Sequence, residues 1–523
     1  MMSEMNGMDK LALLTTLLAA GFLYFKNKRR SALPFPPGPK KHPLLGNLLD
    51  LPKKLEWETY RRWGKEYNSD VIHVSAGSVN LIIVNSFEAA TDLFDKRSAN
   101  YSSRPQFTMV RELMGWNWLM SALIYGDKWR EQRRLFQKHF STTNAELYQN
   151  TQLEYVRKAL QHLLEEPSDF MGITRHMAGG VSMSLAYGLN IQKKNDPFVD
   201  LAQRAVHSIT EASVPGTFWV DVMPWLKYIP EWVPGAGFQK KARVWRKLQQ
   251  DFRQVPYQAA LKDMASGKAK PSFASECLET IDDNEDAQRQ REVIKDTAAI
   301  VFAAGADTSL SGIHTLFAAM LCYPEVQKKA QEELDRVLGG RRLPEFTDEP
   351  NMPYISALVK EILRWKPATP IGVPHLASED DVYNGYYIPK RAVVIGNSWA
   401  MLHDEETYPD PSTFNPDRFL TTNKSTGKLE LDPTVRDPAL MAFGFGRRMC
   451  PGRDVALSVI WLTIASVLAT FNITKAIDEN GKELEPDVQY WSGLIVHPLP
   501  FKCTIKPRSK AAEELVKSGA DAY

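Results

Sequence analysis

The stretch FGFGRRMCPGRDVA, Phe443 to Ala456, contains one of the four cysteines in this chain of 523 residues. Cys450 stands between glycines and behind two arginines, and a long apolar run follows it. Pro451 suits the first position of a helix, because the N–H that proline lacks has no intrahelical partner there. We therefore predict a helix with the sequence DVALSVIWLTIASVLATF and place Cys450 at its N-terminal end.

The position of Cys450 favours a metal-binding thiolate. Free amides and the helix dipole at a helix N-terminus favour the thiolate over the thiol. Gly446 and Gly452 permit tight turns and the close approach of a flat ligand. A single thiolate suits haem iron, whereas zinc needs three or four ligands and no His/Cys cluster supplies them. The alternative for such a cysteine, taken by itself, is a structural role in a helix cap.

This loop has five fixed residue types over ten positions, with the spacing FxxGxRxCxG. The spacing resembles the haem-binding loop of the cytochrome P-450 family, and the resemblance extends over roughly Pro34 to Arg508. It implies a mainly α-helical cytochrome P-450 fold with small β-sheets, and a haem b (iron protoporphyrin IX) whose iron has Cys450 as its axial ligand. The other loop residues that it places at the haem are Phe443, Gly446, Arg448 and Gly452.

A second segment, AGADTS, Ala304 to Ser309, resembles the family's oxygen-binding motif (A/G)Gx(D/E)T(T/S). The resemblance implies that Thr308 hydrogen-bonds to dioxygen and that Asp307 connects to a proton source, so both are predicted to be catalytic. Protonation of the distal oxygen makes O–O cleavage possible. The alternative is a satisfied polar kink in a buried helix, because a threonine can donate to its own helix.

Two further elements appear in the family's chain order. Glu361 and Arg364 are three residues apart on one helix face, and Arg418 follows in PDRF. They resemble the ExxR and PERF-like elements, whose Glu–Arg–Arg cluster has a structural role.

Five residues are predicted to hold the haem propionates. Trp129 and Arg133 are four residues apart in WREQR, which resembles the family's WxxxR, and their N–H groups suit a carboxylate. By resemblance Arg448 meets the other side of the haem, with His375 and Arg104 as further partners.

The resemblance implies a monooxygenase that uses O2 and electrons derived from NADPH. The chain has no GxGxxG after a strand and no ferredoxin cysteine spacing, so a separate NADPH-cytochrome reductase is expected. Five basic residues are interpreted as a docking face for this reductase, with an ordinary solvated charge run as the alternative: Lys128, Arg130, Arg134, Arg447 and Arg453.

The substrate is predicted to be hydrophobic. The chain resembles fungal secondary-metabolism members of the family, and a terpenoid-type skeleton is our first expectation, with a polyketide or an indole as alternatives. The candidate pocket segments are mainly apolar with aromatics: 107–120, 367–374 and 490–498. Competing interpretations are a reductase-independent haem-thiolate isomerase, a haem sensor or carrier, and a membrane-tethered helical scaffold.

The N-terminus predicts a membrane anchor. Residues 11–25 are apolar, and the basic run 26–30 follows them, so the main body is expected to face the cytosol from the endoplasmic reticulum membrane. A cleaved signal peptide is the alternative. The predicted divisions are an anchor at 1–30, a proline-rich hinge at 31–39, a catalytic domain at 40–508 and a polar, frayed tail at 509–523.

Composition fits this organisation, with 44% hydrophobic, 24% charged and 10% aromatic residues. A net charge of +2 gives no electrostatic case for nucleic acid as a partner. Cys277, Cys322, Cys450 and Cys503 are far apart, which is typical of a reducing compartment. We further predict a β-hairpin at 70–85 and a central buried helix from Glu292 to Cys322.

Overall fold

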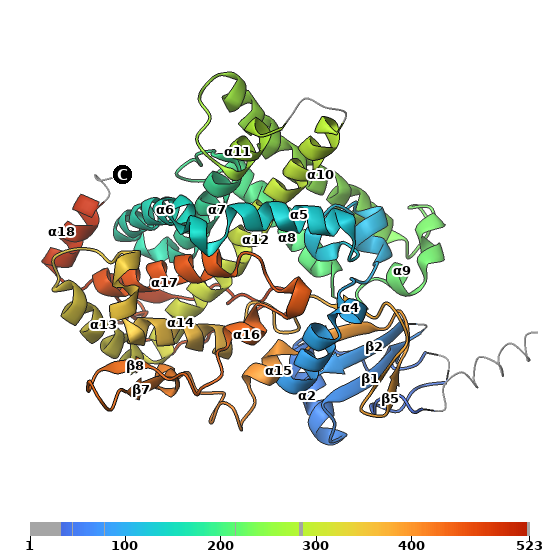
Figure 1. The fold of residues 1–523 in the computed structure, drawn as a ribbon. Coiled ribbons are helices and arrows are strands. Elements are labelled where there is room, and N and C mark those ends of the chain that lie inside the picture. The colour runs from blue at the N-terminus through green and yellow to red at the C-terminus, as the bar shows by residue number, and fades with distance from the viewer. Residues whose placement is uncertain (1–32, 44, 78, 215, 282–285, 520–523) are drawn as a thin grey trace, which may run out of the picture.

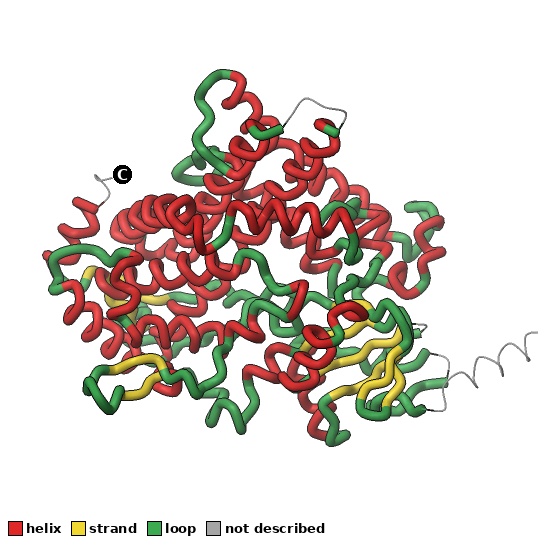
Figure 2. The backbone as a smooth tube through the Cα atoms, viewed as in Figure 1, coloured by secondary structure: helices red, strands yellow, loops and turns green. Residues whose placement is uncertain are grey.

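The computed structural model describes residues 33–519, apart from residues 44, 78, 215 and 282–285. The predicted membrane anchor lies outside the described residues. Figure 2 shows that the described chain is mainly helical, as predicted, with a few small sheets. The longer α-helices are α2 (Glu56–Glu66), α5 (Asp127–His139), α6 (Ala145–Glu165), α7 (Phe170–Tyr187), α8 (Pro197–Ala212), α10 (Gly237–Ala265), α11 (Phe273–Glu279), α12 (Ala287–Cys322), α13 (Pro324–Leu338), α14 (Pro353–Trp365), α17 (Arg453–Thr470) and α18 (Lys510–Gly519).

Shorter elements complete the described chain. The short α-helices are α3 (Phe87–Ala90), α4 (Ser98–Tyr101), α9 (Trp219–Val222), α15 (Ser398–Leu402) and α16 (Ala439–Ala442), and a π-helical segment covers Met109–Leu113. The strands are β1 (Val71–Ala76), β2 (Val79–Val84), β3 (His375–Leu376), β4 (Asp381–Tyr383), β5 (Tyr386–Ile388), β6 (Val393–Gly396), β7 (Leu420–Thr422), β8 (Leu429–Leu431), β9 (Phe471–Lys475) and β10 (Cys503–Pro507).

Helix α12 runs through the centre of the helical part, as Figure 1 shows. Apolar residues cover all its sides over most of its length, which is typical of a helix buried in a core. Its largest contact is with α7, and it also packs against α5, α8, α10 and α17. The predicted central helix is therefore confirmed, and it begins earlier than expected, at Ala287.

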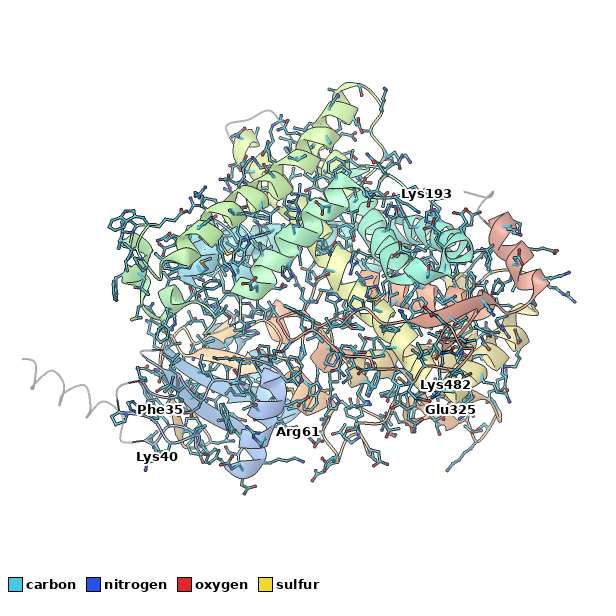
Figure 3. The ribbon with its side chains drawn as sticks, turned by 180° about the vertical axis from the view of Figure 1, so that it is seen from behind. Phe35, Lys40, Arg61, Lys193, Glu325 and Lys482 are labelled. Carbon is cyan, nitrogen blue, oxygen red and sulfur yellow. The ribbon has the colours of Figure 1, made fainter. Side chains whose placement is uncertain are left out.

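The largest sheet has the strand order β1-β2-β6-β3. The predicted hairpin is confirmed, because β1 and β2 pair antiparallel. β6 pairs parallel with β2, and β3 pairs antiparallel with β6, so the sheet joins the start of the domain to residues much later in the chain. Figure 3 places Phe35 and Lys40 beside this sheet and Glu325 far from it, so the described chain begins on the sheet side.

An ion cluster built on the fully buried pair Glu361 and Arg364 connects α14 to the segment that precedes β7. Arg364 donates from Nε to Glu361 Oε2 at 2.7 Å, and a second bond of 2.8 Å makes the pair bidentate. Arg418 Nε lies 3.2 Å from the same Oε2. The spare donors of Arg364 bond to the carbonyl oxygens of Leu402, Pro411 and Thr413. The Glu–Arg–Arg set therefore comes together and ties the coil to the helix.

Two expectations about helix ends are wrong. Helix α17 begins at Arg453, and Pro451 lies in the turn before it, because the loop around Cys450 closes on itself before the helix starts.

The tail after Arg508 is not frayed over its length, because α18 packs on α6 and α17. Ala512 and Val516 recur one turn apart and are buried, which gives this polar helix an apolar stripe.

Within the described part of the chain, α17 is the helix that is long and apolar enough to cross a membrane. Most of it is buried, and it packs against α6, α12, α13 and α14. It is therefore a core helix of the fold.

Candidate active site

The loop around Cys450 is closed by backbone hydrogen bonds. The N–H of Cys450 donates to the carbonyl oxygen of Phe443 at 2.9 Å, and the N–H of Met449 donates to that of Gly446 at 3.1 Å. A further turn at 451–452 leads into α17. The loop therefore holds Cys450 directly before the N-terminus of a buried helix.

The backbone of this loop requires glycine at one of the two expected positions. Gly446 has a φ of +54°, and an added Cβ would lie 2.2 Å from the carbonyl oxygen of Phe94. Gly452 has a φ of −93°, and an added Cβ would make an ordinary contact of 3.6 Å with Phe136. The backbone therefore requires glycine at Gly446, whereas the φ of Gly452 and the protein atoms around it would also admit a side chain.

We expect Gly446→Ala to displace the loop and to lower the haem content of the purified protein. The left-handed conformation alone costs an alanine about 1–2 kcal/mol, and the clash with Phe94 adds to it. The ratio of haem absorbance to protein absorbance measures the effect. Gly427→Ala is the matched control, because Gly427 has a φ of +68° with open space around it. Equal haem loss in both variants would assign the effect to general strain.

The helix N-terminus lowers the pKa of the Cys450 thiol as expected, through the N–H of Gly452, but burial has the larger effect. Cys450 keeps some accessible surface, but protein surrounds it, and burial raises the pKa of its thiol. The N–H of Gly452 and the charges of Arg133 and Arg453 lower this pKa, but by less. A thiolate here therefore needs a further cation, which a bound metal ion supplies.

The predicted propionate residues come together from separate elements. The Arg448 guanidinium lies 4.6 Å from the ring centroid of Trp129 on α5. Arg133, one turn further along α5, donates to the carbonyl oxygen of Met449 at 2.5 Å. Arg104 is near enough to Arg448 that their charges interact, and burial and both arginines lower the pKa of His375.

This cluster of buried cations fits an anionic cofactor. Burial lowers the pKa of Arg448 to about 9, and burial together with Arg448 lowers that of Arg104. Among the described residues, Arg104, Arg133 and Arg448 form no ion pair with a carboxylate, and Arg104 Nε is buried without a hydrogen-bond partner. The guanidinium groups of Arg104 and Arg448 donate to backbone carbonyl oxygens, which do not neutralise their charge. A buried charge without a counter-ion is costly, so the two carboxylates of haem b suit this cluster.

The middle of α12 is less buried than its two halves. All residues at 293–302 and 309–321 are buried, whereas those at 303–308 keep accessible surface and Ala304 is exposed. This stretch is the predicted oxygen-binding segment. On the N-terminal side of this stretch, α5 contacts α12, and Gln132 Nε2 lies 3.5 Å from Asp296. On its C-terminal side, α17 packs against α12 at Gly312. The elements that carry Trp129 and follow Cys450 therefore flank the accessible stretch on both sides.

Asp307 and Thr308 have different partners. Thr308 Oγ1 donates to the carbonyl oxygen of Ala304 at 2.7 Å, so the bond of the kink alternative is present. Asp307 Oδ1 lies 3.1 Å from His497 Nε2. The sequence did not indicate a role for His497. The segment 490–498 was selected for its apolar character, and no motif or periodic spacing relates this histidine to Asp307.

A comparison with known protein families matches residues 36–505 to the model described as cytochrome P450. The chain belongs to the cytochrome P450 family. This P450 is 46% identical over 518 residues to cytochrome P450 monooxygenase ple1 of Rhodocybe pseudopiperita, which covers 99% of this chain and 98% of the relative. It is 41% identical over 512 residues to tryptamine 4-monooxygenase of Psilocybe cyanescens, covering 97% and 99%.

A third relative, cytochrome P450 monooxygenase 98 of Postia placenta, is 45% identical over 493 residues, 94% of each chain. These similarities identify the protein as a cytochrome P450 monooxygenase. Its cofactor is haem b, which the family binds through a cysteine thiolate.

The predicted docking residues of this P450 lie on α5, in the Cys450 loop and at the first position of α17: Lys128, Arg130, Arg134, Arg447 and Arg453. Arg130 and Arg447 both stack on the ring of Tyr125, at 5.2 and 5.3 Å. This shared ring holds positive charge from the two elements side by side. Arg453 is half-buried and bonds to Asp454 at 3.1 Å, so it adds less to an exposed face.

Proposed function

We propose that this P450 oxidises a hydrophobic small molecule of the terpenoid type, with O2 and with electrons from a separate NADPH-cytochrome reductase. One observation carries the proposal most: buried cations without carboxylate partners surround the loop that holds Cys450. Such an arrangement suits a haem whose propionates are neutralised beside its thiolate ligand.

The roles of the cofactor residues follow from their positions. Cys450 is the proposed axial ligand, and Phe443, Gly446 and Gly452 shape the loop around it. Bound haem supplies the iron that activates O2 for insertion into a C–H bond. The propionate partners are Trp129, Arg133, Arg448, His375 and Arg104.

The proposed catalytic pair is Asp307 and Thr308. The hydroxyl of Thr308 can turn from its own helix to donate at the accessible stretch of α12. Asp307 then supplies Thr308 with a proton, so that the hydroxyl keeps donating. A reductase-independent isomerase does not need this pair, which is why monooxygenation ranks first.

We expect Thr308→Ala to uncouple NADPH use from product formation. Without the hydroxyl, Asp307 has no group through which to direct protons, so hydrogen peroxide rises and product falls about tenfold or more. NADPH, peroxide and product are measured in parallel. Thr297→Ala is the matched control, because Thr297 makes the same bond to its own helix, 2.8 Å to Val293. Fully coupled turnover by the Thr308 variant would reassign this threonine to helix structure.

The segment 107–120 favours a neutral, apolar substrate. Its π-helical part, Met109–Leu113, packs against α8 and α10. Its buried side chains are Thr108, Met109, Val110, Met114, Trp116, Trp118, Leu119 and Met120. The acids around it are engaged: Glu112 pairs with Lys227 at 2.6 Å, and Asp221 accepts the N–H of Met109 at 2.8 Å. A substrate ammonium group finds no free carboxylate in these contacts.

A second candidate substrate is an indole amine. One observation favours it, since a relative at 41% identity is named tryptamine 4-monooxygenase. A polyketide is a third candidate of the same chemistry. The test is to express the full chain with a reductase, supply terpenoid hydrocarbons, polyketides and tryptamine, and identify products by mass spectrometry. Hydroxylated tryptamine without any terpenoid product would replace the first candidate by the second.

We also propose that residues 11–25 anchor the protein in the endoplasmic reticulum membrane. The apolar run followed by a basic cluster supports this orientation, with the catalytic part in the cytosol. The basic residues around Tyr125 then face a reductase in the same membrane system.

A further inference from the structure

Asp307 is surrounded by titratable or charged groups from α7, from α12 itself and from the segment 490–498. His497 Nε2 lies 3.1 Å from its Oδ1. Burial raises the pKa of Asp307, but the contact with His497 and the charge of Arg175 hold it below its ordinary value. Within the described part of the chain, His497 Nε2 has no hydrogen-bond partner of good geometry, so this close contact is its main polar interaction.

His314 is not the histidine that pairs with Asp307. It is fully buried, its Nε2 lies 3.0 Å from Thr174 Oγ1 on α7, and burial lowers its pKa to about 3. It is therefore neutral at physiological pH. The ring of His497 lies 6.5 Å from that of His314 and keeps 20% of its side chain accessible.

Residues of helices α7, α8 and α12 line a small cavity at Asp307. Its room for water is about 20 Å³, and a cavity needs about 10–15 Å³ to hold a water molecule. Arg175, Asp307 and Gln203 line it, among others, and Gln203 is exposed on the outside of α8. The cavity therefore connects the carboxyl group of Asp307 with the surface of the protein.

Close packing fixes the inner wall of this cavity. An added Cβ at Gly305 would lie 2.5 Å from Ser182 Oγ, so α12 approaches α7 as closely as a glycine allows. Gly179 on α7 lies against Val199 of α8 in the same way, with an added Cβ 2.9 Å from it. The small residues bring the three helices together around Asp307 while leaving the space beside it open.

We propose that His497 is a positioning residue for Asp307 and that protons reach Asp307 through the cavity between α7, α8 and α12. The proposal rests on the proposed function, in which Asp307 and Thr308 serve O2 activation. The carboxylate of Asp307 takes a proton from cavity water, and bulk water restores that proton at the Gln203 end. Asp307 then passes the proton to the Thr308 hydroxyl as that hydroxyl donates its own. The carboxylate is regenerated, and no electrons move at these side chains.

The contact with His497 predicts the direction in which the pKa of Asp307 changes when the histidine is replaced. A carboxyl group whose pKa is held low stays ionised down to a lower pH than an ordinary one. Removing His497 removes the largest lowering influence, so the pKa of Asp307 rises and the group becomes protonated at a higher pH. Without the contact at 3.1 Å the carboxyl group is also no longer held in one position, so proton transfer from Asp307 to Thr308 is expected to slow.

The test compares His497→Gln with the unmodified full chain. Infrared difference spectra against Asp307→Asn follow the Asp307 carboxyl band as a function of pH, and we expect its titration to move to higher pH. In the haem-loaded protein with reductase and no added substrate, we expect NADPH oxidation to slow about tenfold and its solvent deuterium isotope effect to increase. His207→Gln is the control, because His207 is exposed on α8 and contacts Trp491 instead.

The outcomes separate the two proposals. If His497→Gln leaves the carboxyl titration unchanged, or shifts it without changing the rate and the isotope effect, the role of His497 is refuted. If the unmodified chain lacks the thiolate signature of haem, the proposed function fails instead, and the infrared titration still tests the contact. Should His497→Gln not fold, Gln203→Leu is the second variant. The apolar leucine side chain replaces the polar group at the outer end of the cavity. An unchanged isotope effect in the Gln203→Leu variant would refute the proton route.

Discussion

Cys450→Ser is expected to abolish the thiolate-type carbon monoxide difference band of the reduced protein and to reduce monooxygenase activity to background. A serine hydroxyl is a hard, weakly acidic ligand, and it cannot replace a thiolate that donates electron density to iron. The absorption spectrum of the reduced, carbon monoxide-treated protein measures the change. Haem content is determined on the same sample, because loss of the ligand weakens haem retention as well.

The other cysteines provide the control for this experiment. Cys503 on β10 is half-buried, as Cys450 is, and burial raises the pKa of its thiol in the same direction. Cys503→Ser should leave the band unchanged. An unaltered spectrum in the Cys450 variant would remove this residue as the ligand, and a band lost only in the Cys503 variant would transfer the role.

Glu361→Gln is expected to cost about 3–5 kcal/mol of stability, because it leaves the fully buried Arg364 without its counter-ion. Arg418 loses its carboxylate at the same time. The carbonyl groups that accept from Arg364 do not neutralise its charge. We expect little soluble protein at 37 °C, and the soluble yield and thermal unfolding midpoint at lower temperature measure the loss.

A surface glutamate separates this effect from a general loss of charge. Glu332 lies on α13 and is exposed, so Glu332→Gln is expected to change stability by less than about 0.5 kcal/mol. Near-normal stability of the Glu361 variant would contradict a structural role for the cluster. Inactive but stable protein would point to a role of Glu361 in the chemistry itself.

The sequence alone determined the features that depend on neighbouring residues. The spacing from Phe443 to Gly452 identified the cysteine loop, and the apolar run after it predicted a buried helix. The motif at 304–309 was likewise identified from its own residues, and it coincides with the accessible stretch of α12. These signals are readable because helix periodicity and close backbone approach restrict residue types locally.

Local patterns misjudged the ends of elements. Pro451 suited a first helical turn, but the hydrogen bond from Cys450 to Phe443 closed the loop first. The tail at 509–523 was polar enough to suggest fraying, but Ala512 and Val516 found a partner surface on the folded helices. A short amphipathic segment is stable as a helix only when its apolar face packs against the rest of the fold, and its own sequence does not contain that information.

Only the tertiary structure decided which charged groups meet. Arg104, His375 and Arg448 come from three distant segments, and the sheet order β1-β2-β6-β3 and the loop closure bring them together. The contact between His497 and Asp307 has the same origin. Side chains far apart in the chain share no period or spacing, so their contact, and the pKa shifts that it causes, arise only once the packed helices fix their positions.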